Sequence, residues 1–236
     1  MKDLKIAKNG KRLFYGLSLT LLVFALATYT GWKWAWHTAF IPTSFVTHSF
    51  MLAFSIVLIL ALRKQVDYKC SLPKFKQTLR PFLFGILTTV VNVPLAIVSK
   101  LLGNGSEIHH VLTAMTPLQV FVFVFIYASV AEEFLFRGFL MNILKPLKNK
   151  GFHLFDRTIT MPVWVSAITF GLAHLILFAT GASALFVFRI VVFTTLLGLI
   201  AGYYQEKHDN HAFAIIVHIA GNLMGLVAAI MKNFTA

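Results

Sequence analysis

Two adjacent glutamates, Glu132 and Glu133, interrupt a long apolar stretch and are the first residues whose type and place suggest chemistry. Lys145 marks the end of that stretch, and at about 1.5 Å per helical residue Glu132 lies ~20 Å from it, within the hydrocarbon of a membrane. One acid at that depth costs roughly 2.5–3.5 kcal/mol on insertion scales. Two in succession therefore indicate a functional site.

Arg137 follows Glu133 by four residues, a spacing that predicts an ion pair along one face of a helix. Glu132 then points about 100° away around the helix and can face a different cavity. A less neutralised carboxylate in such a cavity suits a general base. Taken alone, the same residues also fit a buried ion pair that only fixes helix contacts.

Two later apolar stretches carry further polar groups at helical spacing. Phe170 and His174 are four residues apart, and so are His218 and Asn222. The small residues beside them, which let neighbouring helices approach closely, are Gly171, Ala173, Ala220 and Gly221. A single intramembrane histidine more often serves helix contacts. Two histidines, an asparagine and two glutamates on three stretches favour one shared site.

Membrane-spanning helices must position these groups. The chain is 58% hydrophobic and 12% charged, with a mean hydropathy of +0.79. Soluble domains carry about 25% charged residues, so an ordinary cytoplasmic globule and a disordered chain are excluded. Uncharged runs near the roughly 20 residues of a spanning helix predict seven spans, at 13–31, 42–62, 82–102, 117–144, 159–180, 184–205 and 211–231.

The expected fold is an all-α, polytopic helix bundle that forms a single integral domain of the cell membrane over residues 1–236. The remaining histidines give no comparable pattern: His48 is a lone residue near the outer end of the second span, and His211 falls at a span end.

Topology explains the net charge of +13. Sixteen Lys and Arg fall on the side that holds the N-terminal segment, and three, Lys33, Lys100 and Lys232, fall on the other side. The positive-inside rule then predicts a cytoplasmic N-terminus. Membrane lipid is the expected partner of the basic side, because anionic headgroups attract it, and no nucleic-acid partner is expected.

Three motifs follow one another along the chain: Glu-Glu-x-x-x-Arg at 132–137, Phe-x-x-x-His at 170–174 and His-x-x-x-Asn at 218–222. Each is weak alone. Together, in this order and each on a separate predicted span, they resemble the CAAX protease and bacteriocin-processing family, also called the CPBP or Abi family. The motif-bearing part is about 117–231, and the first three spans carry no motif.

The resemblance implies an intramembrane endopeptidase that hydrolyses a peptide bond of a peptide or membrane protein, in CAAX-type processing or in bacteriocin or leader-peptide processing with a link to self-immunity. The catalytic residues implied by motif position, with Glu132 activating the water, are Glu132, His174, His218 and Asn222. The supporting residues implied in the same way are Glu133, Arg137 and Phe170.

The resemblance leaves a metal cofactor open. The family is commonly described as metalloproteases, whereas a metal-free glutamate mechanism has been argued for eukaryotic relatives. Two histidines and a carboxylate resemble a catalytic zinc set, so a divalent metal such as zinc would be held by Glu132, His174 and His218. The chain has no HExxH motif, and we favour water activation without a tightly bound metal.

Two other functions remain as alternatives. One is a non-catalytic bacteriocin-immunity or membrane scaffold protein that keeps these residues as a contact network. The other is a proton-coupled transporter with Glu132 and Glu133 as a relay, against which the absence of an internal repeat counts. The complete set of motif residues favours catalysis, and it predicts that these side chains converge in one polar cavity.

Overall fold

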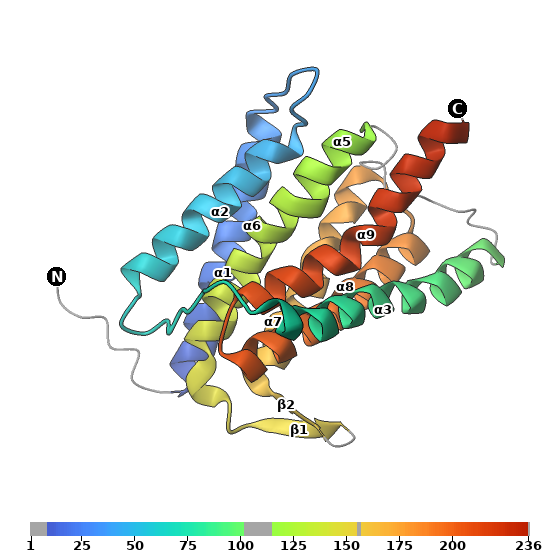
Figure 1. The fold of residues 1–236 in the computed structure, drawn as a ribbon. Coiled ribbons are helices and arrows are strands. Elements are labelled where there is room, and N and C mark those ends of the chain that lie inside the picture. Colours follow the sequence, from blue (N-terminus) through green and yellow to red (C-terminus); the bar gives the residue numbers. More distant parts are fainter. Residues whose placement is uncertain (1–8, 102–114, 155–156, 236) are drawn as a thin grey trace.

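Helices long and apolar enough to cross a membrane make this an integral, multi-pass membrane protein. The computed structural model describes residues 9–101, 115–154 and 157–235 (Figure 1). Six such helices lie in these ranges: α1 (Asn9–Lys33), α2 (Ser44–Ala61), α3 (Phe75–Ser99), the segment Pro117–Met141, the segment Met161–Thr180 and α8 (Ala184–His208). The seventh predicted span corresponds to α9 (Ala212–Thr235).

The all-α prediction is confirmed, apart from one short hairpin. Strand β1 (Gly151–Leu154) pairs antiparallel with β2 (Arg157–Thr160), with Gly151 opposite Thr160. The span predicted from about residue 159 begins two residues later, because residues 159–160 belong to β2 and the helix begins at Met161. Pro162 in its first turn fits this boundary, since proline lacks an N–H that the first turn leaves unused. Residue 102, the predicted end of the third span, lies outside the described residues.

The helix that carries the two glutamates starts at a capping box. The Thr116 hydroxyl accepts a hydrogen bond from the Gln119 N–H, and the Gln119 side chain accepts one from the Thr116 N–H. The helix continues as α5 (Pro117–Gln119), a π-helical segment (Val120–Ala128), α6 (Ser129–Glu133) and a second π-helical segment (Phe134–Met141). The turn with Glu132 and Glu133 is thus flanked by wider turns, a feature frequent at functional sites.

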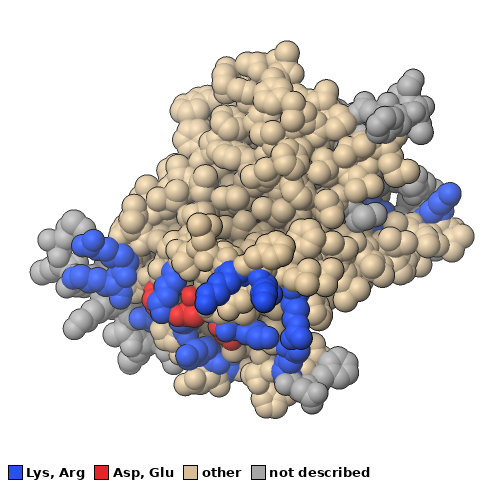
Figure 2. Space-filling view, viewed as in Figure 1, with Lys and Arg blue, Asp and Glu red and all other residues tan. Residues whose placement is uncertain are grey.

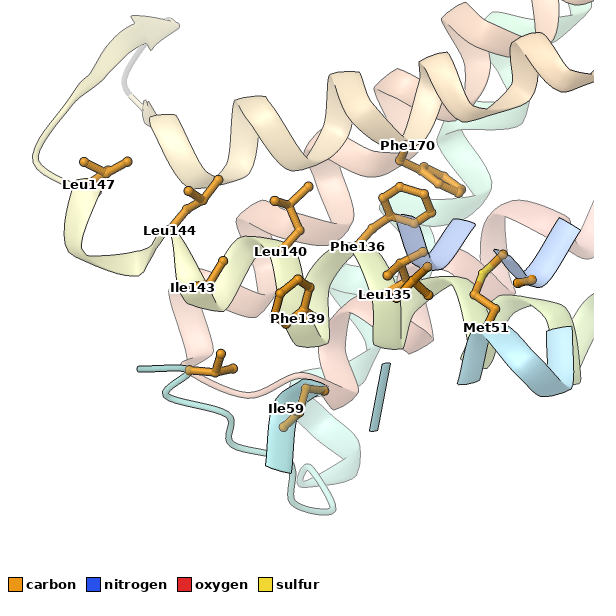
Figure 3. Packing of buried hydrophobic residues seen from close by; sticks show 13 residues of the cluster. Met51, Ile59, Leu135, Phe136, Phe139, Leu140, Ile143, Leu144, Leu147 and Phe170 are labelled. Atoms are coloured by element: carbon orange, nitrogen blue, oxygen red, sulfur yellow. The ribbon is translucent and has the colours of Figure 1, made fainter. Parts of the chain in front are cut away.

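An apolar core fixes this helix against the first two helices (Figure 3). Leu135, Phe139 and Leu140 have no exposed surface and belong to one cluster with Met51 and Ile59 of α2. Tightly interlocked side chains resist rotation of a helix about its axis. The core therefore sets the directions in which Glu132 and Glu133 point.

Small residues bring α9 close to its neighbours. Gly85 of α3 faces α9, and a Cβ atom there would collide with the Val217 carbonyl oxygen and lie 2.7 Å from the Ala220 Cβ. In Figure 1, α9 runs beside α6 and across α3. This close approach places the polar side chains of α9 next to the glutamates of α6.

Charged side chains gather at one end of the bundle. Figure 2 shows most of the visible Lys and Arg there, around a few acidic residues. Lys145 lies 2.6 Å from both Asp67 and Asp209, and Lys69 lies 2.5 Å from Asp209. Hydrogen bonds from Lys145 and Lys69 lower the pKa of Asp209. This network joins three connecting segments at the end that the sequence predicts to be cytoplasmic.

Candidate active site

Glu133 and Arg137 form the predicted ion pair, and neither side chain has any exposed surface. The Arg137 Nη1 donates to the Glu133 Oε1 across 3.0 Å. His218 Nδ1 lies 2.7 Å from the same oxygen. Because an ionised carboxylate only accepts hydrogen bonds, His218 donates from Nδ1 and keeps Nε2 for another partner.

Arg137 is held in place by contacts from two further helices. Its guanidinium carbon lies 4.5 Å from the centre of the Phe170 ring, a cation–π contact. Gly198 of α8 leaves room for the guanidinium, since a Cβ atom there would collide with the Arg137 Nη2 and lie 3.2 Å from the Ala167 Cβ. The Gln205 amide donates to the Arg137 carbonyl oxygen at 3.0 Å. The supporting pair is therefore built into the helix contacts.

Glu132 faces different groups, as its place around the helix predicts. Its Oε1 lies 3.5 Å from the His48 Nε2, and its Oε2 lies 3.6 Å from the His218 Nε2. Its side chain is 20% exposed, unlike the fully buried Glu133. These distances exceed an ordinary hydrogen bond, but catalytic contacts often tighten only when substrate binds.

His174 and Asn222 complete the set that the motifs predict. His174 follows α7 (Met161–Ala173), and its Nδ1 donates to the Phe170 carbonyl oxygen at 3.0 Å. Its Nε2 remains available, and the residue lines the same cavity as Glu132. The Asn222 amide donates to the Ser129 hydroxyl at 2.9 Å, which ties α9 to α6.

A cavity of about 570 Å³ is lined by the four predicted catalytic residues, Glu132, His174, His218 and Asn222. That volume is in the range of small-molecule and peptide side-chain pockets. The first three helices, which precede all the motifs, also form part of its wall. Their contribution consists of Phe24, Thr28, Ser44, Thr47, His48, Met51, Thr89, Asn92, Val93 and Ala96.

His211 stabilises the backbone at the glutamate pair. The His211 Nε2 lies 3.1 Å from the Glu133 carbonyl oxygen, and its Nδ1 lies 3.0 Å from the Tyr68 hydroxyl. A carbonyl oxygen only accepts, so His211 donates from Nε2 and accepts at Nδ1 from Tyr68. The fully buried imidazole is thus satisfied in its neutral form, and it anchors the backbone at the glutamate pair.

The structure thus brings Glu132, His174, His218 and Asn222 to the same cavity. The motifs do not include His48 and His211, since both lie outside the motif spacings and near the predicted ends of spans. The signal for His48 was its type alone, a histidine inside a predicted span. His211 carried no signal, because its partner is a backbone carbonyl group.

Three histidines around a carboxylate raise the question of a metal. Across residues 9–101, 115–154 and 157–235, no three His, Cys, Asp or Glu side chains are arranged to hold a metal ion. Glu132, His174 and His218 share a cavity without forming such a group.

Comparison with known proteins agrees with the motifs. Residues 114–224 match the family model described as type II CAAX prenyl endopeptidase Rce1-like. No curated protein and no solved structure gives a match. The matched range contains every motif residue and excludes α1, α2 and α3. Residues 114–224 of the chain are therefore similar to the Rce1-like CAAX prenyl endopeptidases.

Proposed function

We propose that this protein is an intramembrane endopeptidase in which Glu132 activates the attacking water. One observation carries the proposal: the Glu132 carboxylate opens onto the 570 Å³ cavity while its two oxygens face the Nε2 atoms of two histidines. Glu133 is neutralised by Arg137 and has no exposed surface. Of the two carboxylates, Glu132 alone is accessible to water and substrate.

In the proposed reaction, Glu132 takes a proton from water, and the water oxygen bonds to the carbon of the scissile carbonyl group. His174 Nε2 orients that water, because its Nδ1 is committed to the Phe170 carbonyl oxygen. The carbonyl oxygen gains negative charge. The proton then passes to the leaving nitrogen, the C–N bond breaks, and a carboxylic acid and an amine result.

Asn222 and His218 stabilise the developing oxyanion. The Asn222 amide has two N–H donors, and Ser129 uses one of them. His218 uses Nδ1 for Glu133, so it donates from Nε2 when that atom carries a proton. Donors fixed before the reaction are effective in a site shielded from water, since they need no reorganisation.

The substrate we propose is a peptide or membrane-protein segment that reaches the cavity from the membrane. A CAAX-type terminus is the first candidate, because the family carries that name. Bacteriocin or leader-peptide processing, with a role in self-immunity, is the second. A non-catalytic immunity or scaffold protein is the alternative function.

Mass spectrometry of new protein termini tests this proposal. Membranes from cells that express the wild type are compared with membranes that hold equal amounts of Glu132→Gln. We expect a small set of termini that depends on Glu132, and their sequences identify the substrate class. Identical termini in both samples, with a phenotype kept by Glu132→Gln, would contradict the enzyme and favour the scaffold.

A further inference from the structure

The site includes a histidine from a helix outside the family match. His48 lies on α2, far before residue 114, yet its Nε2 is 3.5 Å from the Glu132 Oε1. It lines the same cavity as the motif residues, and its side chain is 17% exposed. The surroundings of Glu132 therefore include a residue from outside the motif-bearing part of the chain.

The hydrogen bonds of His48 determine which of its nitrogens faces Glu132. Its Nδ1 lies 2.7 Å from the Ser44 carbonyl oxygen, one helical turn earlier. That oxygen only accepts, so Nδ1 carries a proton and donates it. Nε2 is then the remaining polar atom of the ring, 3.5 Å from the Glu132 Oε1, and it donates to that carboxylate when it too carries a proton. This contact fixes the ring orientation, as the outer hydrogen bond of a functional histidine commonly does.

Glu132 is thereby bracketed by two imidazoles that are oriented in the same way. His218 also commits Nδ1, in its case to Glu133, and presents Nε2 to the other oxygen of Glu132. One oxygen of the Glu132 carboxylate thus faces a histidine of α2, and the other faces a histidine of α9. A carboxylate with a single neighbour could rotate about its last bond, whereas one with a neighbour at each oxygen is restricted.

We propose that His48 is a positioning residue that holds the Glu132 carboxylate in the orientation needed to take a proton from water. The proposal rests on the proposed function of Glu132 and extends the site to α2. A displacement of about 1 Å at a reacting group can lower a rate by roughly 100-fold. His48→Leu should therefore reduce kcat by about 10- to 100-fold and change KM by less than about 3-fold.

The activity test uses the full-length protein in detergent micelles and a farnesylated CAAX-box peptide as the probe. His48→Gln should restore kcat to within about 5-fold of the wild type, because the glutamine amide nitrogen reaches nearly the position of the His48 Nε2. Ser49→Ala is the matched control. It removes a 2.8 Å hydrogen bond between α2 and Tyr127 without touching Glu132, and it should retain wild-type kcat.

An NMR measurement separates this proposal from the proposed function. In protein labelled with ¹⁵N-histidine, the Nε2 signal that disappears in His48→Leu is the His48 signal. We expect Glu132→Gln to shift it, since the partner of Nε2 changes. If the wild type does not cleave this peptide, the CAAX-type substrate is contradicted, and the NMR shift alone decides the His48 contact. An unmoved signal, or equal loss of kcat in His48→Leu and His48→Gln, would overturn the positioning role.

Discussion

The buried ion pair of Glu133 and Arg137 permits a sharp test of how the site is held together. Neither side chain is exposed, and their closest atoms are 3.0 Å apart. The perturbations are Glu133→Gln, Arg137→Met and the two combined. Each single change leaves one buried charge without its partner, whereas the double change leaves none.

The expected magnitudes follow from this geometry. At 3.0 Å and an effective dielectric constant near 20, the attraction is about 5–6 kcal/mol. Loss of one partner of a buried pair typically destabilises a protein by about 3–5 kcal/mol, and replacement of both by neutral groups is often close to neutral. We expect about 3–5 kcal/mol for each single variant and less than about 2 kcal/mol for the double variant.

The assay is equilibrium unfolding of the purified protein in mixed micelles, with the denaturing detergent as the variable. A double-mutant cycle isolates the interaction from other effects of the substitutions. The double variant should be more stable than either single variant. If it is as unstable as Arg137→Met, or if the two single effects add, the pair is not what stabilises this part of the bundle.

Three further predictions concern the surroundings of the site. Gly198→Ala should displace Arg137 and cost about 1–3 kcal/mol, whereas Gly10→Ala, with no atom within 4 Å of the added Cβ, should not lower the unfolding midpoint. Hydrogen bonds from Lys145 and a second lysine lower the pKa of Asp209. Its contribution to the free energy of unfolding is therefore present above the unfolded-state pKa and is lost as the pH falls through the lowered value. Asp209→Asn should lower the free energy of unfolding by up to about 1 kcal/mol at pH 7, and its difference from the wild type should shrink below about pH 4. A cytoplasmic N-terminus and seven spans place the C-terminal end outside, so alkaline phosphatase fused there should be active, and an active cytoplasmic reporter at the same point would contradict this topology.

Much of the fold could be predicted from the sequence because lipid imposes a simple rule. A helix that crosses the hydrocarbon needs a long uncharged run, and such runs are visible around α1, α2, α3 and α8. The hairpin of β1 and β2 could not be predicted in this way. The two strands are short, and the hairpin depends on backbone pairing between them rather than on hydrophobicity.

The candidate site was predictable where residues stand one helical turn apart. Glu133 and Arg137 share a face at the i, i+4 spacing, so their pairing needs no knowledge of the other helices. His48 and Glu132 are 84 residues apart in the sequence, with the whole of α3 between them. Their proximity depends on how α2 lies against the fourth helix, and no local spacing encodes that arrangement.

The central claim, that Glu132 is the base for a water molecule, is tested most directly by the cleavage rate of purified Glu132→Gln. The substitution keeps the size of the side chain and removes its ability to accept a proton from water. Because general bases contribute about 10²- to 10⁴-fold, kcat on the peptide that the wild type cleaves should fall by at least about 100-fold, with an unchanged unfolding midpoint. A well-folded Glu132→Gln variant that cleaves within about 3-fold of the wild-type rate would contradict the claim.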